Sequence, residues 1–153
     1  MSERTKINFR LEQDEDGYPP YQWEGLWAEK VAENKYRIDN IPFYVKKLST
    51  GDVVSVRNAA EGLVFEQNLE KSSNSTVRVI LYNESVTSLL LELIKKCGCE
   101  YETGTPKTLI AINVPPKANF SLLLDFLNRE HKADNLDYEE SAIRYNDGRK
   151  GAG

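Results

Sequence analysis

The sequence predicts an α+β protein, in which an N-terminal bent antiparallel β-sheet or partial barrel is followed by a ferredoxin-like β-α-β-β-α-β unit. Two observations predict this order. Before the serine-rich stretch at 72–75, apolar residues alternate with polar ones, and after it they also recur at helical spacing. We therefore expect a β-rich part (residues 1–73), a ferredoxin-like part (residues 74–146) and a polar tail (residues 147–153), with the first two packed as one compact body.

The first predicted strand is followed by a surface loop. Ile7, Phe9 and Leu11 alternate with polar residues, which is typical of a strand that is buried on one face. Residues 12–20 are rich in acidic residues and contain a glycine and two prolines, so they break the strand pattern and predict a loop.

The second predicted strand is rich in aromatic residues. Tyr21, Trp23 and Trp27 fall on odd positions and would share one face, which we expect to pack inward. Asn34 can adopt the left-handed conformation of a turn. Pro42 has no N–H to donate, so the segment around it cannot be a central strand. Further strands are expected at 36–38, 53–56 and 63–70.

The second part contains a strongly indicated helix. After a strand predicted at 76–82, Asn83 can cap the first helical turn. Apolar residues then recur at i, i+3, i+4 and i+7 from Val86 to Cys97, and Gly98 can end the helix. A hairpin at 99–114, a helix at 119–132 and a strand at 138–145 complete the ferredoxin-like order.

Composition disfavours several classes of protein. The 153-residue chain has a net charge of −4 and a pI near 5.2, whereas nucleic-acid-binding proteins carry a basic surface. No run approaches the roughly 18 apolar residues of a membrane span, and the first residues lack a signal-peptide core. The two cysteines favour a reducing compartment. We expect a cytoplasmic protein that binds neither nucleic acid nor membranes.

Three short boxes carry a family resemblance: NIPFY at 40–44, GDVV at 51–54 and STVRV at 75–79. In this order they resemble the bacterial family known as domain of unknown function 4265, whose pattern begins with a Trp-Ala pair, here Trp27-Ala28. The chain departs from the pattern at Ser73-Asn74, where the family has glycine and often histidine. The resemblance implies a bacterial cytoplasmic protein and supplies no established activity.

The reactive residue types do not form a catalytic or metal-binding pattern. His131 is the only histidine and falls on the apolar side of the second predicted helix, where a structural role is expected. Cys97 and Cys99 form a C-x-C pair, but a structural zinc site needs four ligands. Cys97 also completes the apolar stripe of the first helix. We expect no catalytic residues, no metal and no cofactor, and hence no enzymatic activity.

The candidate binding residues are aromatic, polar or acidic. The aromatic residues form either the core of the first part or an exposed patch that anchors a protein partner. The acidic loop is either a solvated surface or a surface for a basic partner. Asn40 and Asp52 can satisfy local backbone groups, and Arg78 is expected to pair with Asp52 or Glu66. The candidates are Trp23, Trp27, Asn40, Phe43, Tyr44, Asp52, Arg78, Asp14, Glu15 and Asp16.

These observations favour a non-enzymatic cytoplasmic protein-binding module. An immunity protein that neutralises a basic toxin domain is one specific form, because electrostatic complementarity speeds the capture of such a partner. The alternative is a small-molecule-sensing regulatory domain of the ferredoxin-like type, which rests on analogy of fold alone. The sequence predicts no particular oligomeric state.

Overall fold

The computed structural model describes residues 4–144, which form an α+β structure with two β-sheets and two α-helices. The chain divides into two compact units, Met1–Ser72 and Ser73–Gly153. The division falls within the serine-rich stretch. The predicted polar tail at 147–153 and Tyr145, the last residue of the final predicted strand, lie outside the described residues.

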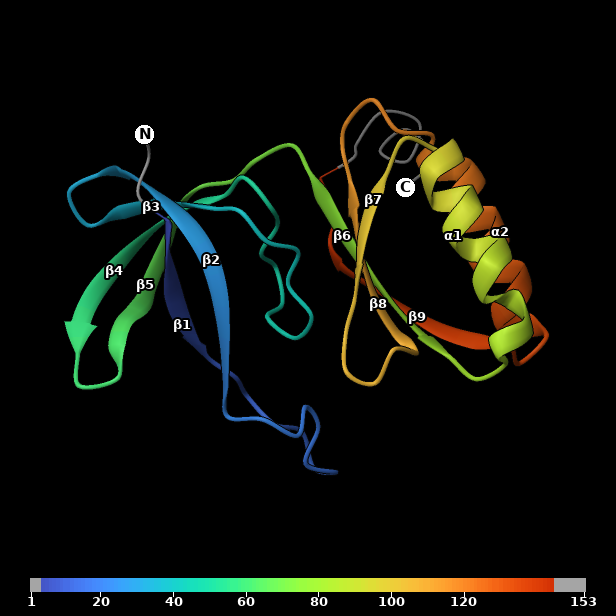
Figure 1. Ribbon diagram of the computed structural model, residues 1–153, viewed down its shortest axis with the longest axis horizontal. Helices are drawn as coiled ribbons and strands as arrows, with labels where there is room; N and C mark the ends of the chain where they lie inside the picture. Colours follow the sequence, from blue (N-terminus) through green and yellow to red (C-terminus); the bar gives the residue numbers. More distant parts are fainter. Residues whose placement is uncertain (1–3, 145–153) are drawn as a thin grey trace. The chain divides into compact units, whose positions relative to one another are not determined.

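The first unit is a closed β-barrel (Figure 1). Successive strands pair antiparallel, and β1 also pairs with β5 in parallel, with Asn8 opposite Val64. This last pairing closes the sheet, for which the sequence predicts only a bent sheet or partial barrel. The strands are β1 (Arg4–Arg10), β2 (Trp23–Ala32), β3 (Lys35–Ile38), β4 (Val53–Ala59) and β5 (Gly62–Glu70).

The barrel interior is filled by aliphatic side chains together with the rings of Phe9 and Tyr36. Leu26 and Ala28 of β2 are 2% and 0% exposed. Trp27, between them, is 39% exposed, so the prediction that the aromatic face of this strand packs inward is wrong. A strand alternates its side chains between two faces, and the narrow interior of a small barrel accepts Leu and Ala more readily than two tryptophans. The buried cluster comprises Ile7, Phe9, Leu26, Ala28, Tyr36, Ile38, Leu48, Val54 and Val56.

The turns of the barrel follow the local chemistry of the sequence. Asn34, between β2 and β3, has φ +60°, as predicted. The segment around Pro42 forms no strand, also as predicted, and residues 39–52 run as an irregular connection from β3 to β4.

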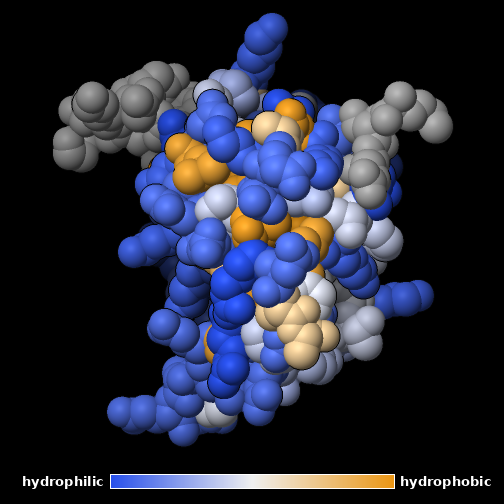
Figure 2. Space-filling view, turned by 90° about the vertical axis from the view of Figure 1, so that its left-hand side faces the viewer, coloured by the Kyte–Doolittle hydropathy of each residue, from blue (hydrophilic) through white to orange (hydrophobic). Residues whose placement is uncertain are grey.

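Figure 2 shows a largely hydrophilic face of the molecule with only small apolar patches, in keeping with an interior that collects the apolar side chains.

The second unit is a four-stranded sheet in the order β7-β8-β6-β9, with antiparallel neighbours throughout. Both α-helices lie on one face of this sheet (Figure 1). The last strand begins two residues before its predicted start, because Leu136 is buried and pairs with Leu81. The elements are β6 (Ser75–Leu81), the 3-10 helix η1 (Glu84–Val86), α1 (Thr87–Lys96), β7 (Glu100–Thr103), β8 (Leu109–Val114), α2 (Phe120–Lys132) and β9 (Leu136–Ala142).

Side-chain caps define the helix starts. The Asn83 side chain accepts from the Ser85 N–H at 3.0 Å, so it caps η1, which leads directly into α1. Asn119 caps α2 by accepting from the Leu122 N–H at 3.1 Å. Gly98 follows α1 with φ +84°, which is the left-handed geometry that ends many helices. The predicted roles of Asn83 as a cap and of Gly98 as the residue that ends the first helix are therefore confirmed.

The helices are short and amphipathic. The longer one, α2, has 13 residues, whereas a membrane span needs about 20. Among residues 4–144, no helix combines the length and apolar character required to cross a bilayer.

Candidate functional site

The segment 39–52, which contains the NIPFY box, is held by hydrogen bonds to its own polar residues. Asn40 accepts from the Trp27 N–H at 2.7 Å, and the Thr50 hydroxyl donates to the Asn40 carbonyl at 2.7 Å. Gly51 has φ +91° and donates its N–H to the Ile38 carbonyl. Asn40 therefore anchors this connection to β2, which gives the candidate binding residue a positioning role.

Asp52, the acidic residue of the GDVV box, is fully buried. Its carboxylate accepts from the backbone N–H groups of Ser49 (3.1 Å) and Ser72 (2.8 Å) and from the Asn68 amide (2.9 Å). Hydrogen bonds to a charged acceptor are stronger than neutral ones. Asp52 thus ties β4 to the end of the unit.

A second buried carboxylate, Glu24, was not found from the sequence. It is 9% exposed, and it accepts from three successive backbone N–H groups, those of Phe43 (2.8 Å), Tyr44 (3.0 Å) and Val45 (2.9 Å). Its position in β2 could have revealed it, because Glu24 lies two residues before the buried Leu26 and so faces the same side of the strand. An acidic residue at an inward position needs partners to be buried. Glu24 thereby fixes Phe43 and Tyr44, two of the predicted site residues.

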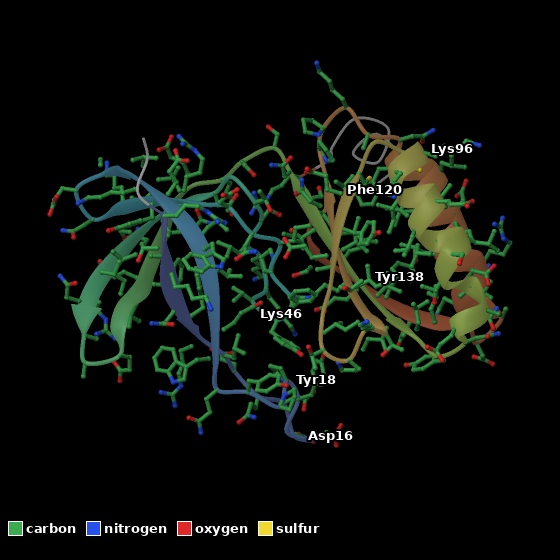
Figure 3. All side chains as sticks on the ribbon, in the orientation of Figure 1. Asp16, Tyr18, Lys46, Lys96, Phe120 and Tyr138 are labelled. Carbon is green, nitrogen blue, oxygen red and sulfur yellow. The ribbon has the colours of Figure 1, made fainter. Side chains whose placement is uncertain are left out.

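The acidic loop between β1 and β2 is organised by Asp14. Its carboxylate accepts from the N–H groups of Asp16 and Tyr18, both at 2.9 Å, and Gly17 takes φ +78° in the turn between them. Glu15 and Asp16 are exposed. Of the three predicted acidic site residues, Asp14 shapes the loop, and the other two provide its exposed charge. Figure 3 labels Asp16 and Tyr18 in this loop.

Three tyrosines meet beside this loop, and we call Tyr18, Tyr21 and Tyr44 the tyrosine surface. The Tyr44 ring centroid lies 6.1 Å from that of Tyr18 and 5.6 Å from that of Tyr21. Tyr18 and Tyr21 are 46% and 49% exposed. The structure therefore brings predicted Tyr44 together with two tyrosines that were not among the predicted site residues.

The two tryptophans lie on a different surface, the outer side of β1 and β2. Trp27 lies opposite Lys6 and Trp23 opposite Arg10 in the strand register. The cationic groups of Arg4 and Lys6 lie 5.2 and 5.4 Å from the Trp27 ring centroid, and that of Arg10 lies 5.5 Å from the Trp23 centroid. We call these five residues the tryptophan face. Its basic members were missed, although the alternation in Arg4–Arg10 was visible.

Gly25 makes room for this arrangement. It lies between the two tryptophans on the outer side of β2, and a Cβ atom placed on it would be 3.3 Å from the Lys6 Cδ. The absence of a side chain therefore lets the Lys6 stem cross the strand pair, as expected where a strand glycine permits close approach.

Arg78, in the second unit, is 5% exposed and forms an ion pair with Glu139. The Arg78 Nε and Nη2 atoms each lie 3.3 Å from Glu139 Oε2, across the β6–β9 pairing in which the two residues are opposite. Pairing of Arg78 with Asp52 or Glu66 stays a prediction. The observed contact gives Arg78 a structural role in its own sheet.

The residue types of metal and thiol chemistry are separated or buried. Burial raises the pKa of the Cys97 thiol, and it raises that of Cys99 to about 12, with smaller contributions from Cys97 and Glu100. His131 is half-exposed, and its Nδ1 lies 3.4 Å from an Asp137 carboxylate oxygen. Within the part of the chain described, no three His, Cys, Asp or Glu residues are grouped as a metal site would need.

A comparison with protein-family models identifies the family to which the chain belongs. The model of the domain of unknown function DUF4265 matches residues 24–138, which is most of the chain. The chain belongs to this family. The match begins at Glu24, the carboxylate that holds the NIPFY box, and includes Asn40 and Asp52. No curated protein matches the chain.

A solved structure has a fold similar to that of this chain. The crystal structure of a hypothetical protein from Neisseria gonorrhoeae is similar to it with a TM-score of 0.80 and 22% sequence identity. The similarity covers 92% of this chain and 96% of the other. At this level of identity, the comparison shows that the two proteins share a fold.

Proposed function

We propose that this DUF4265 protein is a non-enzymatic, cytoplasmic protein-binding module that recognises a basic partner through the tyrosine surface and the adjoining acidic loop. The observation that carries the proposal is the clustering of three tyrosines at the surface, with Tyr18 and Tyr21 about half exposed. Tyrosine is one of the residue types that dominate binding energy at protein interfaces.

The charge beside the tyrosines supports a basic partner. Glu15 and Asp16 are exposed in the same loop, and the whole chain has a net charge of −4. Complementary charge steers the encounter with a partner and suppresses wrong ones. An immunity protein that neutralises a basic toxin domain remains the specific form that we propose.

The surface is also ordered before any partner binds. Asp14 fixes the turn that carries Tyr18, and Glu24 fixes the backbone at Tyr44. Gln13 adds a hydrogen bond to the Pro19 carbonyl at 2.8 Å. Preorganisation reduces the entropy lost on association, so an irregular loop can serve as a specific binding surface.

We also assign the second unit to the ferredoxin-like arrangement. Its element order, with one helix after β6 and one after β8, and its strand order β7-β8-β6-β9 support this assignment. The alternative function, small-molecule sensing, rests on this arrangement. A metabolite screen by thermal shift tests it, since a ligand at 100 times its Kd stabilises by about 2.7 kcal/mol.

The main proposal is tested with the products of genes adjacent to that of this protein. Each is purified and titrated by calorimetry against the wild type, Tyr21→Ala and the double variant Glu15→Lys/Asp16→Lys. We expect one basic product to bind, with each variant weakening binding at least about tenfold. Glu92→Lys/Asp125→Lys, at exposed positions of α1 and α2, makes the same change in charge and is the matched control. Failure of every product to bind, or equal affinity for all variants, would refute the proposal.

A further inference from the structure

We propose that the tryptophan face is a second binding surface and that its ligand is a short, extended, acidic protein segment. This goes beyond the proposed function, because the ligand has the opposite charge and the surface is a different one. The face comprises Arg4, Lys6 and Arg10 of β1 together with Trp23 and Trp27 of β2.

The composition of the face matches what protein interfaces use. Trp and Arg are, with Tyr, the residues most enriched among those that dominate binding energy. Trp27 points outward from β2, between the buried residues Leu26 and Ala28, and is 39% exposed. A guanidinium group that stacks on a ring keeps its N–H donors available at its edge for a carboxylate. The face thus offers flat apolar area and directed positive charge together.

The spacing of the cations suits an extended ligand. Lys6 and Arg10 lie four residues apart on one face of β1, and alternate residues of a strand lie about 6.6 Å apart on one face. Alternate side chains of an extended peptide have the same spacing. One carboxylate of such a peptide can therefore meet Lys6 beside Trp27, and another, four residues along, can meet Arg10 beside Trp23.

Local charge distinguishes this ligand from nucleic acid. Up to Ser73 the chain has 10 basic and 13 acidic residues, so the unit as a whole does not attract a long polyanion. Arg4 already pairs with Asp39 at 3.1 Å, which leaves Lys6 and Arg10 as the cations offered to a ligand. Nucleic-acid sites need an extended basic footprint, whereas two cations beside two tryptophans match a segment with a few carboxylates.

The two tryptophans of the chain provide a direct measurement. The sequence contains no others, so the intrinsic tryptophan emission reports on this face alone. The probe is a decapeptide of alternating Asp and Thr, titrated at low ionic strength. We expect a saturable change in emission that weakens with added salt.

Matched variants assign the binding to the face. Lys6→Gln/Arg10→Gln should weaken peptide binding at least about tenfold, whereas Lys95→Gln/Lys96→Gln, which removes two exposed cations from α1, should leave it unchanged. Circular dichroism and thermal melting establish that each variant is folded. Glu15→Lys/Asp16→Lys should not weaken this binding, so failure here is distinguishable from failure of the tyrosine surface.

Several outcomes would overturn the proposal. One is an emission spectrum that does not change up to about 1 mM peptide, because a Kd above that concentration is too weak for specific recognition. Another is equal affinity for the wild type and Lys6→Gln/Arg10→Gln. Tighter binding of a thymidine decanucleotide than of the peptide would assign the face to nucleic acid. Emission that changes with protein concentration alone, together with a rising mass, would assign it to a second copy of the chain.

Discussion

The barrel carries two aromatic surfaces that are built in different ways. The tyrosine surface lies on irregular segments, the loop between β1 and β2 and the connection at 39–52. The tryptophan face lies on the paired strands β1 and β2, where backbone register places Lys6 opposite Trp27 and Arg10 opposite Trp23. One surface is acidic in its surroundings and the other is basic.

The comparison shows what each kind of surface needs in order to be ordered. On irregular backbone, N–H groups have no ladder partner, so buried or local carboxylates must accept them. Glu24 accepts three and Asp14 two. On the strand pair, the ladder satisfies the backbone, and the side chains only have to fit one another. We therefore expect the tyrosine surface to fail when a carboxylate is lost, and the tryptophan face to be insensitive to it.

The largest effect is expected from Asp52→Ala, which removes the anchor of the irregular connection. Three donors, from Ser49, Asn68 and Ser72, would lose their acceptor in a buried place. Each buried unpaired group costs about 1–3 kcal/mol, so we expect urea unfolding to show a loss of about 3–5 kcal/mol. Asp52→Asn keeps one acceptor oxygen and should lose less. A loss below about 1 kcal/mol for Asp52→Ala would contradict the anchoring role.

Glu24→Gln tests the comparison most directly. The amide retains one acceptor oxygen for three N–H groups and directs its own donors at them, so we expect a loss of about 2–3 kcal/mol in the free energy of unfolding. Calorimetry should show weaker binding at the tyrosine surface, while acidic-peptide binding at the tryptophan face stays within about twofold. Glu29→Gln, on the same strand but half-exposed, is the control. Equal damage to both surfaces would contradict the comparison.

The pH dependence of stability provides a reference outside both surfaces. The folded-state pKa of Cys99 is raised to about 12, above the ordinary value of 9.0. Between these values the unfolded chain loses a proton that the folded chain keeps. The ionisation of this thiol therefore leaves the free energy of unfolding unchanged below pH 9 and lowers it as the pH rises above 9. The slope due to this thiol is at most about 1.4 kcal/mol per pH unit. Cys99→Ala should show a shallower fall in urea titrations, and identical slopes would argue against the shift.

The smallest effect on stability is expected from Trp27→Ala. The substitution removes two cation–π contacts at an exposed site, each worth about 0.5–1 kcal/mol. The thermal midpoint should therefore change little, while the acidic decapeptide should lose its binding. Val31→Ala, at an equally exposed position of β2, is the control. A large loss of stability would mean that Trp27 is part of the core.

Much of the fold could be predicted because it depends on local patterns. The alternation in 7–11 and the helical stripe from Val86 to Cys97 identify strands and helices, and Asn83 and Asn119 mark helix starts. Closure of the barrel could not be predicted, since the pairing of β1 with β5 joins residues far apart in sequence. The period-2 pattern in β2 correctly indicates two faces, but it does not determine which of them is buried.

The candidate site was less predictable for the same reason. Trp23 and Trp27 could be selected by residue type, whereas Arg4, Lys6 and Arg10 join them only through cross-strand register. Glu24 was overlooked because an acidic residue is ordinarily exposed, and the three N–H groups that donate to it lie about twenty positions away in the chain. Predicted Asp52 accepts from the nearby Ser49 N–H, as Asp often does, but also from Asn68 and Ser72, and Asn40 accepts from the N–H of Trp27 on β2.

Closure of the barrel has a consequence for how any ligand could be read. In the described part of the first unit, each strand has a hydrogen-bonded neighbour on both sides, β1 meeting β5 at the pair Asn8–Val64, so the barrel has no edge strand that is unpaired along its whole length and ready to extend the sheet with a visiting chain. Contact must then be made by side chains alone. Main-chain pairing, which fixes whether a guest runs parallel or antiparallel to its host, plays no part. A peptide lying across β1 and β2 would therefore be selected by the side chains that it presents to Lys6, to Arg10 and to the two tryptophan rings.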